Sequence, residues 1–472
     1  MTRNQWCFAI GTVGRDLAAA GLFMNYLLMA VMLTKPLTAA QWGVLTAVIA
    51  GARILDAFLD PLMGLVIDAS TSRFGRFKPW LIISGLGTAA MIIASFNNPL
   101  QGSAFIVTFA LWYVGFNVFF TMNDVAYWGM LPSLTPKGHN RDRLTSMTTL
   151  MAGLGALLNN LLVPLATVGP HAWGGSAVSG YAQIAVVFAM VMIATQALTV
   201  FGVHVPNNAA RPARVKMRTI ISVFRRNDQA RWTAVILLMY MSLTTLASTI
   251  MPIYLYVACG YSGMPLVIFT GVGQVATALA LVGFARLTAS IARKKILTWA
   301  VGLSMSGYAG VLLVGGLISG PTKIWWLAGL NVLPAVGNGL IYLILLITLA
   351  NVVDYHAWRF GEQRVGIITA SRPFVTKIGL ALGQLGAMVS YWLTKTLPLT
   401  QKIATYEQAT ARGTLSAQAK QQAIANVLTQ LPSAQGWELL AMATIVPACG
   451  LLLAVKLYQR RIILDEALVA KF

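Results

Sequence analysis

Four carboxylates lie near the middle of long apolar segments, where an isolated charge is costly. Of the 13 Asp and Glu residues, these are Asp16, Asp56, Asp60 and Asp124. A carboxylate at the centre of a bilayer costs about 2.5–3.5 kcal/mol on insertion scales. We therefore expect these four side chains to face a cavity, a cation or one another.

Asp56 and Asp60 are four residues apart and share one face of a predicted helix, with Arg53 one turn earlier. Two nearby carboxylates repel each other, so one binds a proton or a cation bridges both. This pattern predicts a site for a coupling ion. The alternative is a structural bridge between Arg53 and Asp56, with Asp60 pointing to solvent.

A second acidic position has an aromatic neighbour one helical turn away. Asp124 follows Thr121 by three residues and precedes Trp128 by four. A carboxylate accepts hydrogen bonds from adjacent hydroxyls, and a Trp ring offers a flat face to the C–H side of a pyranose. We expect a sugar platform here; the alternative is a Trp at the membrane interface. Arg15 and Asp16 either join the same cavity or form a local pair.

Arg372 and Lys377 are the only cations between positions 367 and 391. We expect Lys377 to balance Asp60 or Asp124; the alternative is a side chain that reaches to the membrane interface. The four His residues lie in loops or at helix ends, without metal-ligand spacing, and no phosphate-binding loop is present. We therefore expect no metal centre, no cofactor and no use of ATP.

The composition indicates that these residues belong to a membrane protein. The chain has 472 residues, of which 57% are hydrophobic and 10% charged, whereas soluble domains have about 25% charged residues. This balance excludes a disordered chain, a nucleic-acid domain and an ordinary cytosolic enzyme. The net charge of +21 is expected to gather in short loops on one side of a membrane rather than to bind nucleic acid.

Twelve segments match the length of about 20 apolar residues that a membrane span needs. They lie at roughly 8–33, 42–67, 80–97, 104–130, 144–168, 181–204, 232–257, 264–286, 296–318, 324–353, 367–394 and 437–458. The expected fold is an all-α polytopic membrane protein with two six-helix halves, as in major facilitator transporters. The expected parts are an N-terminal half (1–204), a basic cytoplasmic linker (205–231) and a C-terminal half (232–472) with an outer loop (395–436) and a cytoplasmic tail.

The loop charges orient the chain. Lys and Arg gather in loops on the side of the N-terminus, whereas the opposite loops are short and nearly uncharged. Since cytoplasmic loops carry the excess of basic residues, both termini are expected in the cytoplasm.

Two stretches carry a family resemblance: RILDAFLDPLMG at 53–64 and DASTSRFGRFKPW at 68–80. They resemble the helix 2 and loop 2–3 signature of the glycoside–pentoside–hexuronide:cation symporters. Shorter matches follow in the expected order over nearly the whole chain.

The resemblance implies a major facilitator fold and the following roles. The cation site would contain Asp56, Asp60 and Thr121. The sugar site would contain Arg15, Asp16, Asp124, Trp128, Tyr342 and Arg372. Coupling would involve Lys377 and Arg53, and cytoplasmic gating would involve Asp68, Arg73, Arg76 and Asp354.

Three departures from the family pattern bear on ion and substrate. Leu59 supplies no oxygen where the melibiose carrier has Asn, which favours H+ over Na+ as the coupling ion. The family's helix 5 arginine is replaced by Thr148-Thr149. Arg372 adds a guanidinium, so the substrate is either a neutral glycoside or an anionic hexuronide.

These observations predict a secondary symporter that takes up a sugar or glycoside with a cation by alternating access. The resemblance implies a multi-pass protein of the bacterial cytoplasmic (inner) membrane, whose partners are the sugar, the cation and membrane lipid. The alternatives are a lysolipid transporter, a membrane enzyme acting on lipid-linked sugars and a non-transporting sugar sensor. We expect no enzyme activity and no nucleic-acid partner.

Overall fold

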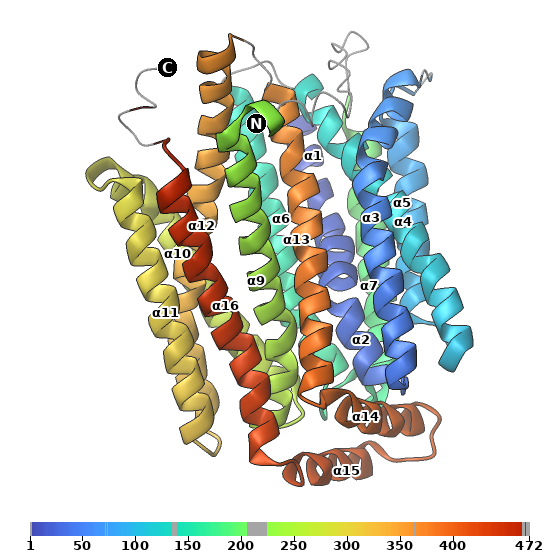
Figure 1. Ribbon diagram of the computed structural model, residues 1–472. Helices are drawn as coiled ribbons and strands as arrows, with labels where there is room; N and C mark the ends of the chain where they lie inside the picture. The colour runs from blue at the N-terminus through green and yellow to red at the C-terminus, as the bar shows by residue number, and fades with distance from the viewer. Residues whose placement is uncertain are drawn as a thin grey trace. The chain divides into compact units, whose positions relative to one another are not determined.

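The computed structural model describes residues 2–70, 72, 74–134, 139–204, 224–361, 365–464 and 468, and every regular element in these ranges is a helix. The helices before residue 205 are α1 (Arg3–Arg15), η1 (Asp16–Tyr26), α2 (Leu27–Thr34), α3 (Ala39–Ala69), α4 (Lys78–Phe96), α5 (Gly102–Leu134), α6 (His139–Thr167), η2 (Trp173–Gly175) and α7 (Ala177–Gly202). Those after residue 224 are α9 (Asp228–Cys259), α10 (Gly263–Ser290), α11 (Arg293–Leu317), α12 (Lys323–Phe360), α13 (Val365–Leu393), α14 (Thr396–Ala411), α15 (Ala417–Thr429) and α16 (Ser433–Arg461). Figure 1 labels most of them.

Ten candidate membrane spans are found among the described residues, and the first is built from α1, η1 and α2 together. With α3 (31 residues) and α13 (29 residues), they coincide with the twelve expected segments. The helices extend beyond the apolar runs; α12, for example, continues to Phe360. A helix satisfies its own backbone groups, so the polar flanks continue it at little cost.

The chain divides into two compact units. Unit 1 contains residues 1–212, 261–264 and 397–429, and unit 2 contains 213–260, 265–396 and 430–472. The boundary near residue 212 falls inside the expected basic linker, 205–231, of which 205–223 lie outside the described residues. The placement of 397–429 differs from the expected division, which assigned the whole outer loop to the C-terminal half.

Each unit has a core of buried apolar side chains. In unit 1, Phe8, Tyr127 and Met130 belong to a cluster shared by α1, α3, α4, α5, α6 and α7. In unit 2, Ile344 and Leu451 belong to a larger cluster. Large apolar residues are also exposed, such as Val282 at 82% and Leu317 at 80%. Such exposure is expected of helices whose outer faces contact lipid.

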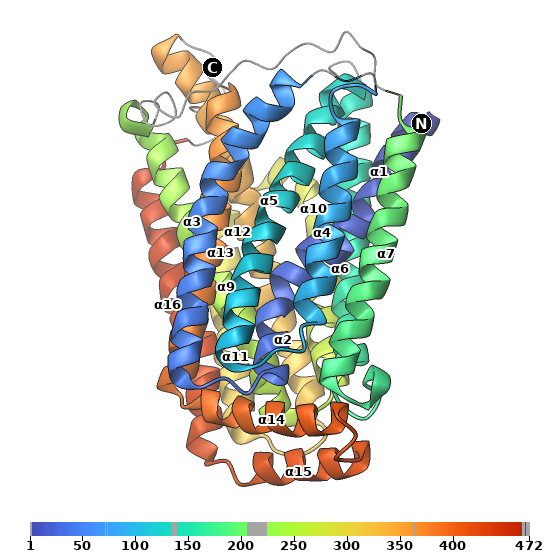
Figure 2. The same cartoon turned by 90° about the vertical axis from the view of Figure 1, so that its right-hand side faces the viewer.

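The expected outer loop 395–436 forms two helices, α14 and α15. They lie across the end of the unit 1 helix bundle, opposite the start of α1 (Figure 2). Gln408 Nε2 on α14 donates to the carbonyl of Thr34 at 2.6 Å. This contact fixes α14 to the end of the first span.

Candidate functional site

An arginine joins the acidic groups of two helices in unit 1. Arg15 Nη1 lies 2.6 Å from Asp124 Oδ1 on α5, and Arg15 Nη2 lies 3.4 Å from Asp16 Oδ2. Thr12 Oγ1, one turn earlier, also donates to Asp16. The side chain of Arg15 is 6% exposed and that of Asp124 is 42% exposed. The cluster therefore has a buried cationic end and an accessible carboxylate.

Two aromatic rings contact this guanidinium. Arg15 Cζ lies 4.9 Å from the ring centroid of Tyr127 and 5.4 Å from that of Trp128. The Tyr127 hydroxyl donates to the carbonyl of Phe8, and the two rings stack at 4.4 Å. Because Tyr127 is held in the core, Trp128 is the half-buried aromatic face beside the charges.

The backbone of the first span positions this cluster. Asp16 opens a π-helical segment, Asp16–Tyr26, a geometry that occurs frequently at functional sites. α6 comes close at this point because Gly155 has no side chain. A Cβ on Gly155 would lie 2.6 Å from the carbonyl oxygen of Val13. Close packing of α6 therefore holds the first span where it presents Asp16.

A second buried polar contact joins α3 and α5. Thr121 Oγ1 donates to Asp56 Oδ1 at 2.7 Å, and the two residues are 1% and 2% exposed. Arg53, one turn before Asp56, is 4% exposed, and its Cζ lies 6.0 Å from the ring centroid of Tyr113. The Nε and Nη1 atoms of Arg53 have no hydrogen-bond partner among the described residues. The structure therefore brings Thr121 and Asp56 together.

Asp60 is half-buried, one turn beyond Asp56 on α3. It carries a polar or electrostatic interaction of its own. Together the two carboxylates offer a buried and a more accessible position for a proton or a cation. Among the described residues, no three His, Cys, Asp or Glu side chains form a group that could hold a metal ion.

The predicted residues of the C-terminal half all belong to unit 2. On α12, Tyr342 stacks on Tyr240 at 5.7 Å, and its hydroxyl accepts from Arg372 Nη2 at 3.0 Å. Arg372 is exposed on α13, and Lys377, five residues further along the helix, is half-buried. Tyr342 and Arg372 are thus neighbours.

The predicted gating residues are only partly described. Arg73 and the side chain of Asp68 lie outside the described residues. Arg76 is half-buried, with its guanidinium 5.2 Å from the ring of Phe77. Asp354 is exposed near the end of α12.

Three participants in these contacts were not predicted from the sequence. Tyr113 and Tyr127 resemble the many other aromatic residues of the spans, so only their contacts with Arg53 and Arg15 distinguish them. Thr12 gave a signal, because it precedes Asp16 by one helical turn.

The fold is that of an all-helical polytopic membrane protein. Solved structures share this fold. A bacterial homologue of the human lysosomal transporter Spinster, inward-facing and unoccupied, matches with a TM-score of 0.62 and 12% identity over 97% of both chains. A mutant form of the nucleoside transporter NupG matches with a TM-score of 0.61 and 12% identity over 95% of this chain and 99% of that chain.

The chain belongs to the MFS/sugar transport protein family, whose model matches residues 7–446. This is a family of transporters. It is 27% identical to a lactose permease of Lactobacillus helveticus, over 81% of this chain and 61% of that protein. It is 22% identical to a raffinose carrier protein of Pediococcus pentosaceus, over 74% of this chain and 55% of that protein. The match thus covers less than two thirds of the length of these relatives.

A third relative has a length closer to that of this chain. The inner membrane symporter YicJ of Escherichia coli (strain K12) is 25% identical over 80% of both chains.

Proposed function

We propose that this protein is a secondary active symporter that takes up a sugar or glycoside together with a cation by alternating access. The contact of Arg15 with Asp124 and Asp16 carries the proposal. It places one accessible carboxylate beside a fixed positive charge and next to the Trp128 ring. A sugar needs hydrogen-bond acceptors for its hydroxyls and an apolar face for its C–H groups.

We assign the coupling cation to Asp56 and Asp60, with Thr121 as a neighbouring hydroxyl. H+ is favoured over Na+, because Leu59 supplies no oxygen ligand. Hard cations are bound by several oxygens, whereas a proton needs one carboxylate. The guanidinium of Arg53, one turn away, supplies a positive charge that balances the carboxylates when no cation is bound.

The remaining roles follow from the same mechanism. The family resemblance assigns Tyr342 and Arg372 to sugar binding, and the two side chains are hydrogen-bonded to each other in unit 2. Lys377 and Arg53 couple cation binding to sugar binding. Cytoplasmic gating is assigned to Asp68, Arg73, Arg76 and Asp354.

The symporter works in the bacterial cytoplasmic membrane with both termini in the cytoplasm. Each cation that enters contributes about 2.3 kcal/mol per 100 mV of membrane potential. This drive, rather than ATP, powers accumulation. Two relatives, a lactose permease and a raffinose carrier protein, support a neutral sugar as substrate.

A hexuronide is the second candidate substrate, because Arg372 is exposed and carries a guanidinium that pairs with carboxylates. Purified protein in liposomes separates the candidates. We expect lactose or raffinose to accumulate under an inward H+ gradient, with weaker uptake under a Na+ gradient. Uptake of glucuronate alone would favour the hexuronide. Absence of uptake of every sugar under both gradients would refute the symporter proposal.

A further inference from the structure

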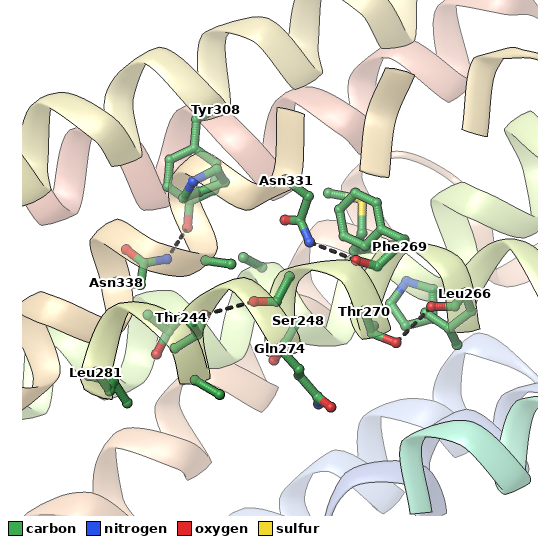
Figure 3. A pocket seen from close by; sticks show the side chains of 18 residues that line it. Thr244, Ser248, Leu266, Phe269, Thr270, Gln274, Leu281, Tyr308, Asn331 and Asn338 are labelled. Atoms are coloured by element: carbon green, nitrogen blue, oxygen red, sulfur yellow. Dashed lines mark hydrogen bonds between the residues drawn. The ribbon is translucent and has the colours of Figure 1, made fainter. Parts of the chain in front are cut away.

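Unit 2 contains a cavity of about 460 Å³, and none of the charged residues described above is among its lining residues. Residues of α9, α10, α11 and α12 line it (Figure 3). Its volume lies within the range of about 300–1,000 Å³ that is typical of ligand pockets. The cavity therefore has the size of a binding site.

All polar side chains that line the cavity are neutral. They include Thr244, Ser248, Gln274, Tyr308, Asn331 and Asn338, and no Asp, Glu, Lys, Arg or His is among the lining residues. Burying a charge without a partner is very costly. The lining therefore excludes ions and favours an uncharged ligand.

Two side-chain amides of the wall are held in fixed orientations. Asn338 Nδ2 donates to the hydroxyl of Tyr308 at 3.0 Å, and its Oδ1 accepts from Ser304 at 3.1 Å. Asn331 Nδ2 donates to the carbonyl of Phe269 at 2.9 Å, which leaves its amide oxygen directed away from Phe269 (Figure 3). Asn331 is thereby prepared to accept a hydrogen bond from a ligand.

Gln274 on α10 supplies the complementary group. Its amide has no hydrogen-bond partner among the described residues, so it can both donate and accept. On the same helix, the hydroxyls of Thr270 and Thr277 donate hydrogen bonds to the backbone carbonyls of Leu266 and Gly273. Their hydroxyl oxygens can therefore still accept hydrogen bonds. A buried amide without a hydrogen-bond partner costs free energy unless a ligand or water forms hydrogen bonds with it.

We infer that this cavity binds a neutral, polyhydroxylated molecule, such as a glycoside or one of its sugar units. Sugar hydroxyls donate and accept, which matches the amides of Gln274 and Asn331, and the C–H faces match apolar wall residues such as Phe269 and Met251. The identification of the ligand as a sugar rests on the proposed function. It adds a second binding site, located in unit 2, and excludes an anionic ligand there.

Site-directed alkylation tests occupancy directly. A variant in which Cys7, Cys259 and Cys449 are replaced by Ser provides the background for Ser248→Cys, inside the cavity. We expect lactose or raffinose to slow its labelling by N-ethylmaleimide at least fivefold, and glucuronate to leave it unchanged. Ser306→Cys is the matched control, because Ser306 is exposed on α11 and does not line the cavity. Protection by a lysophospholipid but not by either sugar would overturn the inference in favour of an acyl-chain site.

Two substitutions test the walls. Ala335→Phe fills the cavity and Gln274→Leu removes the free amide at nearly constant volume. We expect each to raise the half-saturating lactose concentration about tenfold. Val282→Phe, at an exposed position of α10 that does not line the cavity, should leave it unchanged. If Ala335→Phe does not fold, as judged by size-exclusion chromatography, Gln274→Leu carries the test.

The outcomes separate this inference from the proposed function. If the unmodified protein takes up no sugar, the proposed function fails and the inference fails with it. If the unmodified protein accumulates lactose but Gln274→Leu does so with unchanged half-saturation, and Ser248→Cys is not protected, only the inference fails.

Discussion

Lys420 Nζ on α15 lies 3.2 Å from Glu407 Oε2 on α14, and neither side chain is exposed. The same carboxylate oxygen accepts the backbone N–H of Ala177, the first residue of α7, at 2.6 Å. The ammonium donates to the carbonyl of Gly175 at 2.7 Å. The pair thus fixes the α14–α15 hairpin to the start of α7 within unit 1, although α13 and α16, on either side of the hairpin in the chain, belong to unit 2.

Breaking this pair should release the hairpin. Glu407→Gln leaves Lys420 charged and buried, and removal of one partner of a buried pair costs about 3–5 kcal/mol. We expect hydrogen exchange of the α14 and α15 amides to accelerate at least a hundredfold. The double variant Glu407→Gln with Lys420→Met should recover most of the protection. Glu438→Gln, at an exposed position of α16, is the control; an equal effect there would refute a special role of the pair.

A lysine in the loop between α2 and α3 should make the stability of unit 1 depend on pH. Lys35 Nζ donates to the carbonyls of Asn98 and Leu100, at 2.6 and 2.9 Å. Burial lowers the pKa of Lys35 to about 8 from 10.5. The unfolded chain therefore binds more protons between these values, so the stability of unit 1 should rise with pH from about 8 to 10.5. Thermal unfolding in detergent should show this rise, and Lys35→Met should reduce it; an identical rise in the variant would exclude Lys35 as its source.

Asp56→Asn should uncouple transport from the cation. The amide keeps the size of the side chain and a contact with Thr121, but it cannot bind a proton or carry charge. We expect gradient-driven accumulation of sugar to be lost, while sugar exchange across the liposome membrane stays within about threefold. Thr121→Ser, which keeps the hydroxyl, should accumulate sugar normally. Full accumulation by Asp56→Asn would disprove the assigned role.

Asp124→Asn should weaken sugar binding more than stability. The carboxylate is 42% exposed, so its loss costs little folding energy, whereas the amide no longer accepts charge-assisted hydrogen bonds. We expect affinity for lactose to fall at least tenfold, which equals about 1.4 kcal/mol. Isothermal titration calorimetry measures it, with Glu438→Gln as the control. Trp128→Ala should weaken binding as well, and unchanged affinity in both variants would place the sugar elsewhere.

The membrane spans and the acidic positions inside them could be predicted from the sequence. Apolar runs of about 20 residues must form helices in a bilayer, because no other local structure satisfies their backbone groups. A carboxylate within such a run, as at Asp56 or Asp124, needs a partner for the same reason. The resemblance of 53–64 and 68–80 to known symporters was also sufficient to identify the family, which the match over residues 7–446 confirms.

The partners of these carboxylates were decided by tertiary structure. Arg15 contacts Asp124, 109 positions away, because the fold brings side chains of α1 and α5 together, and no local spacing encodes that contact. The same holds for the contact of Thr121 with Asp56. It also holds for the segment 397–429. Its polar composition predicted a loop, but its Glu407 and Lys420 are buried against the start of α7 in unit 1. The hydropathy of a segment indicates whether that segment is buried away from water. Which side chains contact one another depends instead on how helices that are distant in the chain pack together.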